Sequence, residues 1–191
     1  GESGCTTSHL KAIKEFYENS DEPYAIIVED DLDLQLVHNW CFTWKEFYSK
    51  IPYDWDVVQL AVINPGQVHV NIHNRFVNDF STACYMITRH HATKLLKHHI
   101  RGEKYKLDNG VSPRAVADDL IYNSGLTYTI PVFHYKIELG SSIHPEHIEV
   151  FHRNSHDGIL SYWKEEVCKL SDPNALFEYN PYIGRMPPGT S

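Results

Sequence analysis

The sequence predicts a single α/β domain in which helices flank a mixed, mostly parallel β-sheet. Strand-like and helix-like segments alternate along the chain, and residues 24–28 are uniformly apolar, as is typical of a central parallel strand covered on both faces. With 191 residues, of which 42% are hydrophobic, the chain can bury a sizeable core. We expect residues 1–170 to form the domain and residues 171–191, rich in proline and glycine, to form an extended tail.

Apolar periodicity and breaker residues place the individual elements. We expect helices over residues 8–19, 34–49, 90–99, 117–123 and 157–170. We expect strands over residues 24–28, 55–61, 81–88, 126–133 and 148–152. Ser8 is the predicted N-cap of the first helix, the aromatic residues within 34–49 are predicted to belong to the core, and residues 101–113 are predicted to form a surface loop.

The composition of the chain argues against some classes of binding partner. A formal net charge of −8 argues against nucleic acid, because phosphate backbones bind to basic surfaces. No apolar run approaches the roughly 20 residues of a membrane span.

The four cysteines are widely separated, so free thiols are expected, with a disulfide as the alternative. The chain starts without Met or a signal peptide, so we expect a piece of a longer protein, and the sequence does not indicate a compartment.

Three adjacent carboxylates, Glu29, Asp30 and Asp31, follow the apolar run at residues 24–28. Adjacent like charges repel one another unless a cation or a solvated loop accommodates them, and ligands of α/β sheets bind beyond the carboxyl ends of strands. If the backbone stays extended, Glu29 and Asp31 point to the same side. Their hard oxygens suit Mn²⁺ or Mg²⁺. A solvated acidic turn or a helix N-cap is the alternative.

A second acidic pair, Asp118 and Asp119, begins the expected helix at residues 117–123. The helix dipole favours acids at this end, which accounts for one of the two. Two together, after a loop, can instead present a general base to an acceptor hydroxyl.

Histidines are frequent in the C-terminal third. They are His134, His144, His147, His152 and His156. A neutral imidazole suits Mn²⁺ as a further ligand, so one of these side chains is a candidate to complete the metal site. The alternative for each is a surface histidine.

Taken in order, several segments resemble glycosyltransferase family 25, which includes bacterial lipooligosaccharide galactosyltransferases and collagen hydroxylysine galactosyltransferases. The matching segments are Gly4-Cys5 with Ser8-His9-Leu10, residues 27–31, 54–60 and 85–96, Asp118-Asp119, and residues 141–143. Residues 118–122 and 150–154 are also similar to the glycosyltransferase domain of collagen lysyl hydroxylases. The latter similarity favours His152 over His144 as the metal ligand.

The resemblance implies a GT-A fold, a UDP-sugar donor and Mn²⁺ bound at the diphosphate. Asp31 would bind the metal directly and Glu29 directly or through water, with His152 or His144 as the remaining protein ligand. The expected reaction moves galactose or glucose from the UDP-sugar to a hydroxyl of a glycan or a collagen-like hydroxylysine.

The resemblance also assigns roles around the donor and the acceptor. Asp30, together with Ser8 and His9, would contact the donor. Family 25 enzymes invert the anomeric centre, which requires a base for the acceptor hydroxyl. By position Asp119 would be that base, and Asp118 would orient the acceptor.

The chain departs from the family pattern in one important respect, besides lacking the usual acid after Ser142, where Ile143 stands. Members carry a strand–helix–strand segment before the motif that starts at Gly4-Cys5, and it forms much of the nucleoside pocket. Without it, donor binding would be weakened, lost, or completed by an adjacent domain or another copy of the chain. The alternatives to a transferase are therefore a non-catalytic module used for assembly or binding, and a metal-dependent phosphohydrolase.

Overall fold

The computed structural model describes residues 2–66, 68–107, 116–137 and 152–179. The α-helices are α1 (Glu2–Asn19), α2 (Trp44–Lys50), α3 (Arg89–His99), α4 (Ala117–Tyr122) and α5 (Arg153–Glu165). The strands are β1 (Tyr24–Val28), β2 (Leu32–Asp33), β3 (Val57–Gln59), β4 (His73–Asn74), β5 (Cys84–Thr88), β6 (Ile100–Arg101), β7 (Lys104–Tyr105), β8 (Thr127–Thr129) and β9 (His134–Tyr135). Three 3-10 helices are described, η1 (Gln35–Asn39), η4 (Val167–Lys169) and η5 (Pro173–Phe177).

The central sheet is mixed, with the strand order β1-β5-β3-β8-β4. Within the described chain only the β3–β8 pair is parallel, and the other pairs of this sheet are antiparallel. The expectation of a mostly parallel sheet was therefore wrong. Two small antiparallel sheets, β2–β9 and β6–β7, complete the described strands.

Strand β1 lies at one end of the order of the central sheet and not at its centre, contrary to the sequence-based expectation. Its side chains alternate between the two faces. Ile27 is buried toward α1, whereas Ile26 and Val28, on the opposite face, are 42% and 54% exposed. An apolar run does not by itself reveal whether other elements cover both faces, and here only one face is fully covered.

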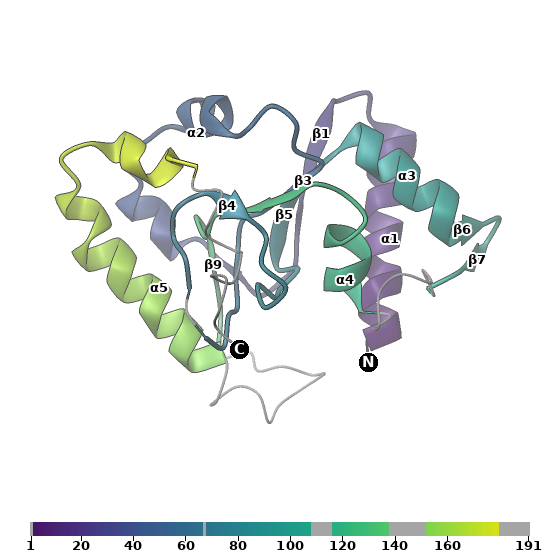
Figure 1. Cartoon of the computed structure of the whole chain (residues 1–191). Coiled ribbons are helices and arrows are strands. Elements are labelled where there is room, and N and C mark those ends of the chain that lie inside the picture. Colours follow the sequence, from purple (N-terminus) through teal and green to yellow (C-terminus); the bar gives the residue numbers. More distant parts are fainter. Residues whose placement is uncertain (1, 67, 108–115, 138–151, 180–191) are drawn as a thin grey trace, which may run out of the picture.

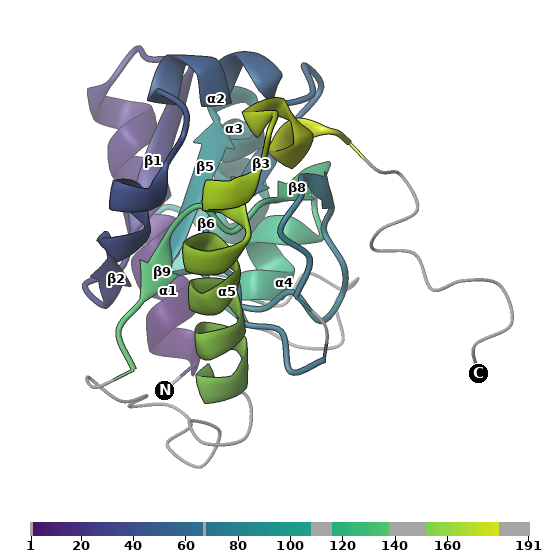
Figure 2. The same cartoon turned by 90° about the vertical axis from the view of Figure 1, so that its left-hand side faces the viewer.

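Helices cover both faces of the sheet, so the domain has three layers (Figures 1 and 2). Alternate residues of β5 define the two cores. Tyr85 and Ile87 pack with α1, α3 and α4, while Cys84 and Met86 pack with α2 and α5. No helix among the described residues is long and apolar enough to cross a membrane.

The expected helix at residues 34–49 is in fact two shorter elements. The 3-10 helix η1 ends at Asn39, and α2 begins after Thr43, whose hydroxyl accepts a hydrogen bond from the backbone N–H of Glu46. The Glu46 carboxylate in turn accepts from the Thr43 N–H, which completes a capping box that starts a new helix. The aromatic side chains do pack against the core, as expected for Trp40, Trp44 and Phe47.

Both ends of the chain also differ from expectation. Helix α1 begins at Glu2, so Ser8 lies inside it and donates to the carbonyl oxygen of Gly4 instead of capping the helix. At the other end α5 starts at Arg153, and η5 lies within the segment expected to be an extended tail. Leu176 of η5 is 1% exposed and belongs to the core. The expected strand at residues 148–152 falls almost entirely outside the described residues.

The buried amide of Gln59 fixes the chain that leads into β5. Its Nε2 donates to the carbonyl oxygens of Asp79, Phe80 and Ser81 at 2.9–3.1 Å, and its Oε1 accepts from the Thr129 hydroxyl at 2.9 Å. Ser81 has a φ of 96°, and no other non-glycine residue of the described chain has a positive φ. Such a conformation costs about 1–3 kcal/mol and persists only where surrounding contacts enforce it.

Replacing Gln59 by Leu removes the donor while keeping the side chain buried. Carbonyl oxygens then lose their partner in the interior, so we expect the free energy of unfolding to fall by roughly 2–4 kcal/mol. Urea denaturation measures this change. The matched control is Gln35→Leu, at a half-buried position, with an expected loss below about 1 kcal/mol. Equal losses in the two variants would contradict the role assigned to Gln59.

Candidate functional site

The acidic run forms a turn at the end of β1. The backbone N–H of Leu32 donates to the carbonyl oxygen of Glu29 at 3.3 Å, and the chain then enters β2. The extended backbone expected for residues 29–31 was therefore wrong. Asp30 is exposed at the tip of the turn, and Asp31 is half-buried. The three carboxylates thus occupy three different environments.

Glu29 points toward α1, on the same side of the sheet as Ile27. Its Oε1 accepts hydrogen bonds from the Thr82 hydroxyl at 2.6 Å and from His9 Nε2 at 3.0 Å. Burial by itself would raise the pKa of Glu29, but the bonds from His9 and Thr82 outweigh burial and lower it. Glu29 is therefore held as an anion.

His9 joins this carboxylate to the middle of the domain. The imidazole is 5% exposed, and its Nδ1 lies 3.1 Å from the hydroxyl of Tyr85. Burial alone would lower the pKa of His9, but hydrogen bonding to Cys5 and Glu29 raises it to about 9. The neighbouring Ser8, also expected at the donor site, is exposed and bonded to its own helix.

Asp31 has the chemistry expected of a cation ligand. Its Oδ1 is buried and has no hydrogen-bond partner among the described residues, while its backbone carbonyl accepts from the Lys136 N–H at 2.8 Å. Burial first, and then the charge of Glu29, raise the pKa of Asp31. A bound cation would relieve both costs, so the Asp31 carboxylate is suited to bind one. Among the described residues, however, the only three ligand side chains that gather within 4.8 Å of one another are Cys5, His9 and Glu29.

The acidic pair lies in the first turn of α4, as expected, without a side-chain cap from Val116. Asp119 is 2% exposed. Asp118 Oδ1 is buried and has no partner within the described part of the chain, and burial raises the pKa of Asp118 against the opposing effect of Arg75. One turn later the hydroxyl of Tyr122 donates to the carbonyl oxygen of Ser81 at 2.8 Å.

The segment Ser81–Thr82 connects the two acidic regions. Thr82 bonds to Glu29 on the β1 side, and Ser81 bonds to Tyr122 on the α4 side. The rings of Tyr85 and Tyr122 meet edge to face at 5.9 Å beneath this segment. The sequence motifs assign no role at the site to Thr82 or Tyr85, because both read as ordinary strand residues.

His152 lies at the start of α5, and its carbonyl oxygen accepts from the hydroxyl of Tyr135 at 2.9 Å. Tyr135 is the register partner of Leu32, which directly follows the acidic turn. The main chain at His152 is thus linked through β9 to the strand that follows the acidic turn. His144 and His147 lie outside the described residues.

Two further histidines stack on each other beside this region. The ring centroids of His134 and His156 are 4.0 Å apart, and His156 Nδ1 lies 2.9 Å from the carboxylate of the exposed Asp157. His134 is fully buried. Burial, and then the neighbouring His156, lower the pKa of His134 to about 4, so its ring is neutral near pH 7.

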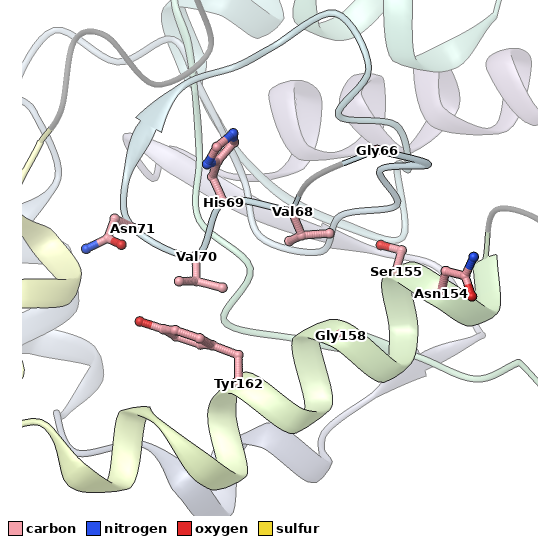
Figure 3. A pocket seen from close by; sticks show the side chains of 9 residues that line it. All are labelled: Gly66, Val68, His69, Val70, Asn71, Asn154, Ser155, Gly158 and Tyr162. Atoms are coloured by element: carbon pink, nitrogen blue, oxygen red, sulfur yellow. The ribbon is translucent and has the colours of Figure 1, made fainter.

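A separate cavity of about 530 Å³ lies between the segment around residues 66–71 and helix α5. Figure 3 shows His69 and Val70 on one side and Tyr162 and Ser155 on the other. Its lining contains no carboxylate, and none of its residues belongs to the acidic turn or to α4. This cavity is therefore not the candidate metal site.

Comparison of the chain with protein-family models, with curated proteins and with solved structures finds no match. The site is accordingly interpreted from its own residues, and the likeness to family 25 stays a prediction from sequence motifs.

The buried His134 predicts acid sensitivity. Its pKa is about 4 in the folded chain and 6.5 ordinarily, so the unfolded chain binds the proton more readily. Stability is then complete above pH 6.5 and falls as the pH drops toward 4, by roughly 3 kcal/mol at about 1.4 kcal/mol per pKa unit. Urea denaturation across this range should show a shallower loss for His134→Gln. The exposed-site control His90→Gln should follow the wild type, and an unchanged profile in His134→Gln would contradict the assignment.

Proposed function

We propose that this chain is the core of a metal-dependent, inverting glycosyltransferase with a GT-A-type domain. One observation carries the proposal. Glu29 of the acidic turn accepts a hydrogen bond from Thr82, and Asp118 in the first turn of α4 is hydrogen-bonded to the backbone of the adjacent Ser81. An anionic site for a cation and a carboxylate able to accept a proton thereby occur side by side, as transfer to a hydroxyl requires.

Asp31 would bind the metal directly, Glu29 directly or through water, and His152 as the third ligand. Unpartnered carboxylate oxygen at Asp31 supports this assignment, and oxygen ligands with one imidazole suit Mn²⁺. When bound, Mn²⁺ supplies positive charge to the diphosphate of a UDP-sugar. Asp30, which is exposed at the tip of the turn, would contact the donor.

The acidic pair of α4 supplies the base. The sequence motif assigns this role to Asp119, but Asp118 has the buried, unpartnered oxygen and the raised pKa. A carboxylate with a raised pKa accepts a proton more effectively near neutral pH. We therefore assign proton acceptance to Asp118 and orientation of the acceptor to Asp119, with galactose or glucose moving to a hydroxyl of a glycan or a collagen-like hydroxylysine.

Removing the Asp31 carboxylate tests the metal site. Asp31→Ala should abolish Mn²⁺-dependent binding of UDP in titration calorimetry and leave the fold intact, because that side chain is half-buried and its Oδ1 makes no hydrogen bond to described residues. The control Asp21→Ala removes an exposed carboxylate before β1 and should bind as the wild type does. Wild-type affinity in Asp31→Ala would refute the assignment.

Amide substitutions test the base. With UDP-galactose or UDP-glucose, Mn²⁺ and a hydroxylysine peptide or glycan acceptor, Asp118→Asn should lower kcat by roughly 10²–10⁴-fold. Asp119→Asn should mainly raise the KM for the acceptor, and both variants should retain Mn²⁺–UDP affinity. A loss of kcat confined to Asp119→Asn would exchange the two roles. Release of phosphate or sugar phosphate instead of UDP would indicate a phosphohydrolase, and no turnover by the wild type would indicate a non-catalytic module.

A further inference from the structure

Three side chains with different ligand chemistry converge between α1 and the end of β1. They are the thiol of Cys5, the imidazole of His9 and the carboxylate of Glu29, and one ligand atom from each lies within 4.8 Å of the others. Cys5 and His9 are four positions apart in α1, which places them on one face of the helix. Glu29 reaches the same point because it follows β1 with its side chain directed toward α1.

The distances between the ligand atoms of Cys5, His9 and Glu29 suit a small tetrahedral ion. Bond lengths of about 2.0–2.3 Å around tetrahedral Zn²⁺ put neighbouring ligand atoms roughly 3.3–3.8 Å apart. His9 Nε2 and Glu29 Oε1 are now 3.0 Å apart, so these two atoms need only separate slightly and Cys5 approach slightly. Cys5 is a half-buried free thiol, close enough to the surface for an ion to reach it.

Contacts with neighbouring side chains already orient the ligand groups of His9 and Glu29. The hydroxyl of Tyr85 lies 3.1 Å from His9 Nδ1, which leaves Nε2 directed at Glu29. The hydroxyl of Thr82 bonds to Glu29 Oε1. Metal-binding histidines and carboxylates are commonly fixed by such second partners.

We infer that Cys5, His9 and Glu29 form a Zn²⁺ site with three protein ligands and a water molecule in the fourth position. Thiolate and imidazole ligands favour Zn²⁺ over Mg²⁺, Ca²⁺ or Mn²⁺. Binding releases the thiol proton of Cys5 and the proton on His9 Nε2 to solvent. The ion would tie α1 to β1, and it would use Glu29, which the proposed function also places at the Mn²⁺ site.

Cobalt titration tests the site, because Co²⁺ substitutes for Zn²⁺ and gives a charge-transfer absorption when a thiolate binds it. The wild type and Cys41→Ser, which changes an exposed cysteine, should bind one equivalent of Co²⁺ with this absorption, and Zn²⁺ should displace it. Cys5→Ser should lose the absorption, and His9→Gln and Glu29→Gln should each weaken binding by about tenfold or more. Absorption that survives in Cys5→Ser, or disappears in Cys41→Ser, overturns the inference.

Separate measurements check that each variant is folded and that the ion binds at Cys5, His9 and Glu29. Zn²⁺ should raise the Tm of the wild type and not that of Cys5→Ser, and circular dichroism of the metal-free variants shows whether each is folded. Asp31→Ala should keep the cobalt absorption while losing Mn²⁺-dependent UDP binding. Loss of the cobalt absorption in Asp31→Ala would place the ion at the acidic turn and overturn the inference. Failure of sugar transfer in the wild type would bear on the proposed function alone.

Discussion

The candidate site depends on one buried amide. Gln59 binds three successive carbonyl oxygens of residues 79–81 and the hydroxyl of Thr129, so it fixes the entry to β5 relative to β3 and β8. That entry includes Ser81, whose positive φ needs such support. With the segment fixed, the Thr82 hydroxyl meets Glu29 and the Ser81 carbonyl meets Tyr122.

Carboxylates around this segment differ sharply in proton affinity. Hydrogen bonds from His9 and Thr82 lower the pKa of Glu29, whereas burial raises the pKa of Asp31 and of Asp118. Acidic groups whose environments separate their pKa values can perform different tasks within one site. The structure thus distinguishes Glu29, which hydrogen bonds hold as an anion, from Asp31 and Asp118, each of which has one buried carboxylate oxygen without a hydrogen-bond partner among the described residues.

Helix α1 has more than a packing role. Leu10 and Ile13 bury against the sheet and the neighbouring helices, and they bring His9 into contact with Glu29 and Tyr85. Tyr85 in turn meets Tyr122 of α4 edge to face. A single row of contacts therefore joins the first helix to α4, which carries the acidic pair. A substitution at the Cys5–His9 face is expected to disturb these contacts as far as α4.

Local sequence signals were sufficient for several features. The helix at residues 117–123 with its two acids, the strand at 24–28, and the helix at 90–99, which starts after the Thr88 N-cap, all occur within a residue or two of expectation. Apolar periodicity, breakers and caps act over a few residues, so a reader of the sequence can recognise them. The split of residues 34–49 was missed because a local capping box outweighed a long aromatic pattern.

Only the tertiary structure decided the direction and order of the strands, since an apolar run such as residues 24–28 suits a central or an edge strand equally. It also decided which groups meet Glu29. The sequence placed Glu29 beside Asp31 in an extended chain, but the turn after β1 and the docking of α1 gave it His9 and Thr82 as partners. The sequence by itself determined where the acids stand along the chain, because charge and propensity are local properties. Their partners depend on contacts between distant segments, which only the packed fold specifies.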